Sequence, residues 1–152
     1  MRCLVVVDAS VVRSAGESEH PVSAACRNCL LAIRDICHRV VLTAPIREEW
    51  KRHMSRFSRK WRRPMAARRK PAEDIVPACV EIGTDSLTDA ERRVVEKDRP
   101  LLEAALAADG VIVSRDSEFR AALARTPQGA RLLDRITWIE PVHDGVQALE
   151  GL

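Results

Sequence analysis

Three aspartates occupy positions from which their carboxylates could converge on one site. Asp8 ends the apolar run 4–7, Asp116 follows closely on the apolar run 111–113, and Asp98 opens the helical pattern before that second run. Each run is typical of a strand buried on both faces of a parallel sheet. Ligands of open α/β sheets bind beyond the carboxyl ends of such strands, so we expect Asp8 and Asp116 to meet there.

Carboxylates that gather in this way repel one another unless a cation neutralises them. An oxygen-rich set of ligands favours Mg²⁺ or Mn²⁺. Such an ion can lower the pKa of a water, orient that water in line with a phosphodiester, and stabilise the leaving oxygen. The acidic residues therefore indicate a metal-dependent phosphodiester hydrolase.

Each aspartate also has a simpler structural interpretation. Asp8 could cap the turn that follows it, and Asp98 and Asp116 could be N-caps of helices. Capping alone does not explain three acids in matching contexts. Asp109 precedes Gly110 and is assigned to a helix-to-strand turn, outside the site.

A basic block covers residues 50–70, which contain ten Lys and Arg and no Asp or Glu, whereas the whole chain has a net charge of +3. The remainder of the chain is therefore acidic. A basic block on an acidic domain points to a polyanion, above all nucleic acid, and the alternative is a solvated helix face. The residues expected to contact RNA are His53, Arg56, Arg59, Arg62, Arg63, Arg68 and Arg69.

The hydrophobic pattern alternates strands and helices along the chain, as in an α/β domain with a central, mainly parallel sheet and helices on both faces. A chain of 152 residues is long enough for one core. We expect one domain over 1–142, with a basic helix and linker at 46–72, and a C-terminal tail at 143–152. The expected strands are 4–7, 39–43, 111–113 and 136–139, and the expected helices are 22–38, 45–64, 88–97, 98–109 and 117–124.

The cysteines and the hydropathy indicate a cytoplasmic protein. The chain has five cysteines, an odd number, which we expect as thiols in a reducing compartment. Cys26-x-x-Cys29 lacks the second pair that makes a zinc motif specific, so buried thiols are the favoured interpretation. No apolar stretch approaches the roughly 20 residues that span a bilayer, so we expect no membrane contact.

Two segments at opposite ends of the chain resemble a known family. Residues 98–116, DRPLLEAALAADGVIVSRD, look like the C-terminal signature of PIN domains, in which an Asp opens a helix and a strand leads to Thr/Ser-Arg-Asp. Residues 6–12, VVDASVV, are similar to the family's opening strand, where Asp is followed two residues later by Ser or Thr. The resemblance covers roughly residues 3–140. The family hydrolyses RNA with Mg²⁺ or Mn²⁺, and toxins of toxin–antitoxin pairs are typical small members.

The resemblance assigns roles to individual residues. Asp8, Asp98 and Asp116 become catalytic and metal-binding acids, and a Glu from the helix after the second strand joins them. Ser10 could orient Asp8 or a water at the metal, and Glu118 holds a peripheral, supporting position. RNA is the expected substrate, and a homodimer and an antitoxin are further partner hypotheses.

Helical geometry helps to choose the fourth acid. At about 100° per residue, an apolar stripe containing Trp50, Phe57 and Trp61 forms one helix face, expected in the core or a dimer contact rather than stacked on bases. Glu49 lies at the border of that stripe and Glu48 faces outward. Glu49-Trp50 also looks like the Glu-hydrophobic pair of PIN domains. We therefore predict Glu49 as the ligand, with His53 and Arg56 on the same flank.

Two other functions fit parts of the sequence. A metal-dependent phosphatase or phosphotransfer domain also keeps an Asp after its first strand, but Asp8-Ala9-Ser10 lacks the second Asp, and no Gly-rich phosphate loop follows. A non-catalytic RNA-binding or scaffold module with a PIN-like fold would use the basic block alone. Metal-dependent RNA cleavage separates a nuclease from such a module.

Overall fold

The computed structural model describes residues 2–152 and shows an α/β domain built on a parallel sheet. The strand order is β3-β2-β1-β4-β5, and every neighbouring pair is parallel. The predicted parallel sheet is confirmed. Its strands are β1 (Leu4–Val7), β2 (Arg39–Val41), β3 (Pro71–Ala72), β4 (Val111–Val113) and β5 (Thr137–Ile139).

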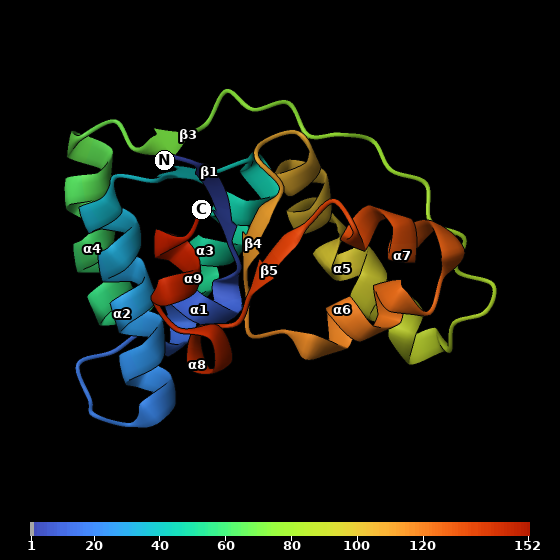
Figure 1. Ribbon diagram of the computed structural model, residues 1–152, viewed down its shortest axis with the longest axis horizontal. Coiled ribbons are helices and arrows are strands. Elements are labelled where there is room, and N and C mark those ends of the chain that lie inside the picture. Colours follow the sequence, from blue (N-terminus) through green and yellow to red (C-terminus); the bar gives the residue numbers. More distant parts are fainter. Residues whose placement is uncertain (1) are drawn as a thin grey trace.

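Helices cover both faces of this sheet. Figure 1 shows α2, α4 and α9 on one side and α5, α6 and α7 on the other. This architecture is the predicted one and is consistent with a single PIN-like domain. The helices are α1 (Ala9–Ser14), α2 (Pro21–Ile36), α3 (Ala44–His53), α4 (Arg56–Ala67), α5 (Asp89–Leu106), α6 (Ser117–Ala124), α7 (Pro127–Leu133), α8 (Pro141–Asp144) and α9 (Gln147–Glu150).

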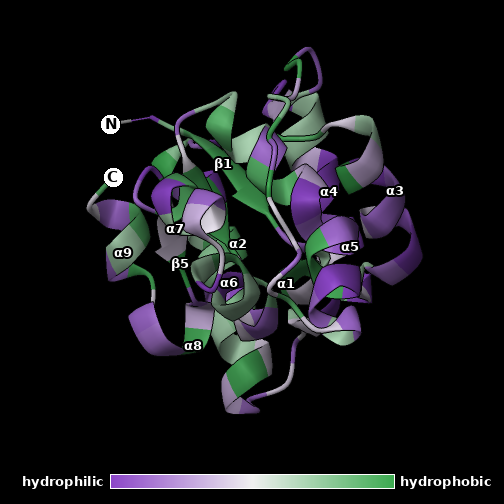
Figure 2. Ribbon diagram, turned by 90° about the vertical axis from the view of Figure 1, so that its right-hand side faces the viewer, coloured by the Kyte–Doolittle hydropathy of each residue, from purple (hydrophilic) through white to green (hydrophobic). Residues whose placement is uncertain are grey.

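The central strands form the core and set the position of Asp8. Val5, Val6 and Val7 are fully buried, because β1 is central and both of its faces are covered. Figure 2 shows hydrophobic strands enclosed by helices whose outer surfaces are largely hydrophilic. The backbone N–H of Asp8 donates to the carbonyl of Val113 at 2.9 Å. Asp8 therefore stands level with the carboxyl end of β4.

The long helix predicted over 45–64 is wrong in one respect, because it is two helices, α3 and α4. The break falls at Ser55, whose backbone N–H donates to the carbonyl of Val12 at 3.0 Å and whose hydroxyl donates to that of Ala15 at 2.5 Å. The same hydroxyl accepts from the N–H of Ser58 and caps α4. Contacts with α1 and the residue after it thus redirect the chain. Pro64 does not end α4, which continues to Ala67.

The two helices predicted over 88–97 and 98–109 are also wrong, because they form the single helix α5. The predicted capping box is present at its start, where the Thr88 hydroxyl accepts from the N–H of Glu91 at 3.2 Å. Pro100 lies inside the helix. Asp98 is therefore in the middle of α5 and is not an N-cap, which leaves its carboxylate free for tertiary contacts.

The last residues of the chain pack against the domain. α8 and α9 contact α2, and Leu149 of α9 is fully buried. The segment predicted as a tail, 143–152, thus includes part of α8 and all of α9. Within residues 2–152, every helix is too short or too polar to cross a membrane.

Candidate functional site

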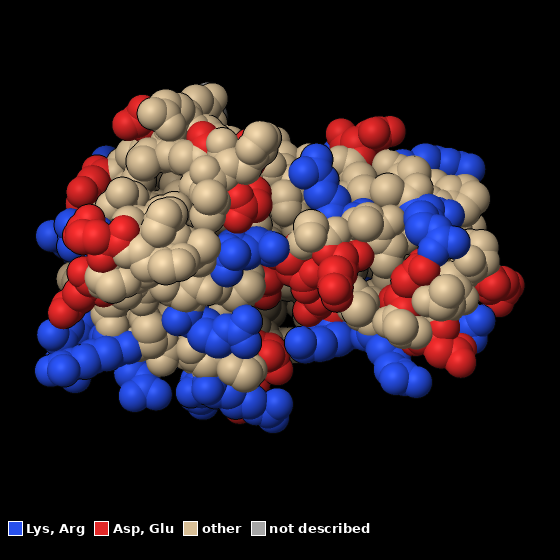
Figure 3. Space-filling model, turned by 90° about the horizontal axis from the view of Figure 1, so that it is seen from below, with Lys and Arg blue, Asp and Glu red and all other residues tan. Residues whose placement is uncertain are grey.

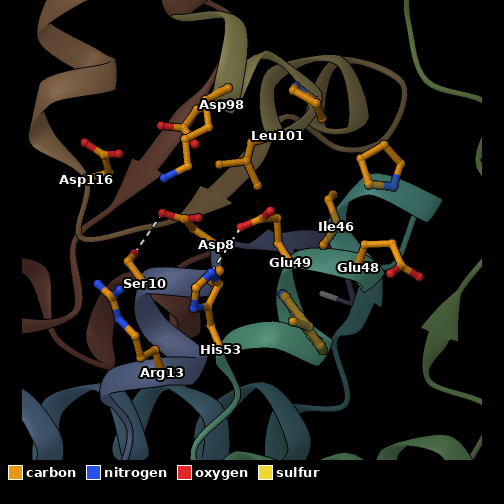
Figure 4. Close-up of a pocket in the computed structure, with 15 residues that line it drawn as sticks. Asp8, Ser10, Arg13, Ile46, Glu48, Glu49, His53, Asp98, Leu101 and Asp116 are labelled. Carbon is orange, nitrogen blue, oxygen red and sulfur yellow. Dashed lines mark hydrogen bonds and ion pairs between the residues drawn. The ribbon is translucent and has the colours of Figure 1, made fainter. Parts of the chain in front are cut away.

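A cavity of about 330 Å³ opens at the carboxyl edge of the sheet, between α1, α3 and α5. Its lining includes Asp8, Glu49, Asp98 and Asp116, so the structure brings together the four acids that the sequence predicted (Figure 4). Figure 3 views the molecule from this edge and shows acidic side chains gathered near the middle, with Lys and Arg on both sides. The charged residues that line the cavity are mostly acidic.

Asp8 is held in place by two serines. It is only 8% exposed, and its Oδ2 accepts hydrogen bonds from the hydroxyls of Ser10 and Ser114, both at 2.8 Å. Each hydroxyl in turn accepts a backbone N–H, from Arg115 at 3.1 Å and from Asp116 at 2.9 Å. One carboxylate oxygen of Asp8 is thereby fixed and the other is left for a ligand.

Ser114 was missed by the sequence reasoning as a site residue. The signal was present, because it holds the Thr/Ser position in the Ser-Arg-Asp ending at 114–116. It is fully buried, and its hydroxyl joins Asp8 to the N–H of Asp116. Ser114 therefore connects Asp8 to Asp116. The sequence analysis expected an orienting role of this kind for Ser10 alone, toward Asp8.

Asp116 serves as the N-cap of α6. Its Oδ1 accepts from the backbone N–H groups of Glu118 at 3.0 Å and Phe119 at 3.1 Å. The capping interpretation is therefore correct for Asp116, and its side chain also lines the cavity. Glu118 has an exposed side chain that does not line the cavity, and it enters the network through its backbone alone.

Asp98 has a pKa well above its ordinary value of 3.8. Its pKa is raised to about 7, and burial is the largest cause. A hydrogen bond with Asp116 and the negative charges of Asp8 and Asp116 contribute to the same rise, against the opposing charge of Lys97. Asp98 is therefore close enough to both other aspartates to be affected by them, and near neutral pH it is partly protonated.

Glu48 and Glu49 both line the cavity but face different ways. The Glu49 side chain is 38% exposed and pairs with His53 Nε2 at 3.5 Å and Arg52 at 3.6 Å. The Glu48 side chain is 57% exposed and pairs with Lys51 at 3.2 Å. Figure 4 shows Glu49 directed toward Asp8 and Glu48 directed away from it. This orientation favours Glu49 as the fourth acid.

The donor set is suited to a hard cation, but it is not assembled as a binding site. Within residues 2–152, no three His, Cys, Asp or Glu side chains are grouped closely enough to hold a metal ion. Carboxylate oxygens alone are the ligands that Mg²⁺ and Mn²⁺ prefer. A bound ion would have to displace the proton of Asp98 and draw Glu49 away from His53.

The predicted RNA-binding residues extend from the cavity along α4 and beyond its end. His53 lines the cavity, and α4 begins at Arg56 near that edge and runs back toward β3, at the opposite edge of the sheet (Figure 1). The arginines of α4 and the two that follow it are available to a ligand, because none of the ion pairs within residues 2–152 involves Arg56, Arg59, Arg62, Arg63, Arg68 or Arg69.

Burial excludes base stacking by the two tryptophans and reactivity of the two buried cysteines. The indole N–H of Trp50 donates to the carbonyl of Val7 at 2.9 Å, and that of Trp61 donates to Leu30 at 2.7 Å. Both rings are core residues, as predicted, and cannot stack on bases. Burial raises the pKa of the Cys26 thiol to about 11 and that of Cys29 to about 12, so both are inert thiols.

Asp109 lies away from the cavity, as expected. Its Oδ2 accepts from the backbone N–H of Leu4 at 2.6 Å, at the amino end of β1. The geometry thus confines the candidate site to the carboxyl edge of the sheet. Comparison with protein-family models, with curated proteins and with solved structures finds no match to this chain.

Proposed function

We propose that this chain is a metal-dependent endoribonuclease that hydrolyses RNA phosphodiester bonds at the acidic cavity. The observation that carries the proposal is the convergence of Asp8, Glu49, Asp98 and Asp116, from separate segments, on one cavity with a strongly raised Asp98 pKa. Acids so placed repel one another and lower the stability of the chain, and a strongly perturbed carboxyl group in a cleft marks a candidate functional site. The resemblance of both ends of the chain to PIN domains points to the same chemistry.

Asp8, Asp98 and Asp116 would hold Mg²⁺ or Mn²⁺, and Glu49 would join them from α3. The ion, when bound, supplies Lewis acidity and a more acidic water. The chain itself supplies orientation. Ser10 and Ser114 fix one oxygen of Asp8, and the first turn of α6 fixes one oxygen of Asp116, so little reorganisation is needed at these two acids.

The arginines of α4 support RNA as the substrate. They stand free of internal ion pairs on the helix that leads away from the cavity, where they can bind backbone phosphates. If RNA binds along α4, the stretch of strand in contact with this helix reaches the cavity at one end. The basic block thereby gains a specific role in guiding a strand to the acids.

A non-catalytic RNA-binding module is the second candidate. It is favoured by the finding that, in the described part of the chain, the acids do not form a ready metal-binding group. It is also favoured by Asp116, which has a complete structural role as a cap. In this case the acids would be remnants and the arginines alone would be functional.

Incubation of the purified protein with mixed RNA, with Mn²⁺ and with excess chelator, separates the two candidates. A nuclease shortens the RNA in Mn²⁺ and leaves it intact in chelator. A binding module retards the RNA in a gel under both conditions without shortening it.

The resemblance extends the proposal to a toxin of a toxin–antitoxin pair in the cytoplasm. Expression of the wild-type chain in a bacterium should then arrest growth, whereas Asp8→Asn should not. Equal growth of the two strains, with equal amounts of soluble protein, would argue against a toxin while leaving the nuclease proposal intact. Size-exclusion chromatography reports on the homodimer.

A further inference from the structure

Two cations share the cavity with the acids. Arg13 of α1 and Lys97 of α5 both line it, and neither was singled out by its sequence context. Figure 4 shows Arg13 of α1 and Asp98 of α5 on opposite sides of Asp8, and Lys97 belongs to the same turn of α5 as Asp98. Each of these two helices therefore contributes one positive residue to the lining of the cavity.

Neither cation is neutralised by the surrounding carboxylates. Within residues 2–152, no ion pair or side-chain hydrogen bond involves Arg13 or Lys97, although five carboxylates line the same cavity. Other cations at this edge are paired, as Lys51 is with Glu48 and Arg52 with Glu49. Arg13 and Lys97 thus keep their donors for a ligand that brings its own negative charge.

Arg13 and Lys97 each lie on a helix close to a residue that contacts or belongs to the group of acids. Arg13 follows Ser10 by three residues on α1, so both project from the same side of that helix, and Ser10 donates to Asp8. Lys97 directly precedes Asp98 on α5, and its charge lowers the pKa of that residue. A strand whose reacting phosphate lies at the acids would present its neighbouring phosphates to these two cations.

We propose that Arg13 and Lys97 bind the phosphates on either side of the reacting one, so that the cavity recognises at least three consecutive phosphates. This inference rests on the proposed nuclease function. It adds the number of consecutive phosphates that the cavity binds. The guanidinium of Arg13 can bind phosphate with two parallel hydrogen bonds, whereas Lys97 acts as a point charge. Both residues bind substrate and take no part in the reaction itself.

The test compares two substrates in Mn²⁺ for Arg13→Gln and Lys97→Gln. One is a labelled oligoribonucleotide, and the other is bis(p-nitrophenyl) phosphate, which has a single phosphodiester and no flanking phosphates. Each substitution should raise KM for the oligonucleotide about tenfold, equivalent to about 1.4 kcal/mol of binding. Arg13→Gln should leave kcat and hydrolysis of the small diester unchanged. Lys97→Gln should reduce hydrolysis of the small diester less than cleavage of the oligonucleotide, because Lys97 also lowers the pKa of Asp98. Arg131→Gln, which removes the same charge from an exposed position on α7, should behave as wild type on both.

A binding measurement adds a readout independent of turnover. Each substitution should also reduce the salt dependence of affinity for a 2′-O-methyl oligonucleotide in chelator, by about 0.7 in the slope. Equal losses on both substrates would overturn the inference, because the residues would then act on the reacting phosphate or on the fold. An unchanged KM and slope would overturn it as well. If the wild type hydrolyses neither substrate, the proposed function fails and this inference fails with it.

Discussion

Asp98 illustrates how the surroundings of a residue change its ionisation. It is half-buried on α5 beside two other aspartates, and its pKa is raised to about 7. Sequence reasoning identified the residue but placed it at a helix start, because the apolar pattern over 98–109 and the resemblance to PIN domains both suggested a helix that Asp98 opens. Ser114 was missed although it holds the Ser of the Ser-Arg-Asp ending, because its hydrogen bond to Asp8 joins segments that lie far apart in the chain. Arg13 and Lys97 belong to no motif of their own, and only the fold brings them to one cavity.

We predict that Asp98→Asn stabilises the metal-free protein more at pH 8 than at pH 5. The folded pKa of Asp98 is about 7 and its ordinary value is 3.8, so the folded state binds more protons between these values. Stability contributed by this group therefore falls as pH rises from about 4 to about 7, and Asn removes that loss. Thermal melting in chelator at both pH values measures it.

Asp85→Asn, at an exposed position in the loop before α5, is the matched control and should shift neither melting temperature. The same shift at pH 5 and pH 8 for Asp98→Asn would show that Asp98 ionises normally. Mn²⁺ added at pH 8 should raise the melting temperature of the wild type more than that of Asp98→Asn, since an ion that binds the folded state stabilises it.

Glu49→Gln should lower Mn²⁺ affinity and RNA cleavage at least about tenfold, which is the lower range for losing a residue that supports a metal site. Glu48→Gln should keep most of both, because Glu48 is directed away from Asp8 in Figure 4. The two substitutions are chemically identical and one residue apart, so each controls for the other. A greater loss in Glu48→Gln would mean that the first turn of α3 rotates on binding metal.

At the scale of elements, the break between α3 and α4 determines where the basic block can act. The apolar stripe continues across the break, because Trp50 and Trp61 are both in the core with ring centroids 6.1 Å apart. Periodicity therefore could not reveal it. The break depends on hydrogen bonds from Ser55 to Val12 and Ala15, which no local pattern specifies. As a result α4 turns back along the sheet.

RNA affinity should depend unequally on the two ends of α4. At about 100° per residue, Arg56, Arg59 and Arg63 share the outward face, opposite the buried Trp61. Replacing these three with Gln should reduce the salt slope for single-stranded RNA by about 2, at roughly 0.7 for each phosphate. Arg68→Gln with Arg69→Gln should have a smaller effect on a short oligonucleotide, since both lie at the end of α4 remote from the cavity. Fluorescence anisotropy across a salt series measures both sets, and equal slopes would contradict an RNA path that starts at the cavity.

For the whole molecule, the sequence predicted the architecture of the sheet well and the short helices poorly. Strands β1 and β4 are as predicted because buried, β-branched runs are unambiguous. α1, α7 and α9 were not predicted, because helices of four to seven residues contain too few turns to show a period. Their positions depend on the core that other elements build. The site residues that follow the ends of strands, such as Asp8 and Asp116, could be predicted from the sequence. Those whose role depends on side-chain hydrogen bonds, such as Ser114, could not.

His38 joins the two ends of the chain and should be important for stability. It is fully buried, its Nδ1 accepts from the N–H of Cys3 at 3.0 Å, and its Nε2 therefore carries the hydrogen toward the carbonyl of Leu149 at 3.0 Å. His38→Ala should lower the free energy of unfolding by about 2–4 kcal/mol, through the cavity and the unsatisfied backbone groups it leaves. Urea unfolding beside the exposed His143→Ala provides the comparison, and equal losses would show that the link is unimportant.

Cleavage of a labelled RNA in Mn²⁺ by Asp8→Asn, Asp98→Asn and Asp116→Asn tests the central claim most directly. Each variant should remain folded by circular dichroism and lose hydrolysis, because each removes an acid from the one cavity. Asp85→Asn should cleave as wild type, and excess chelator should abolish its activity. Full activity in all three cavity variants, or robust cleavage by the wild type in chelator, would contradict a metal-dependent nuclease site at this edge of the sheet.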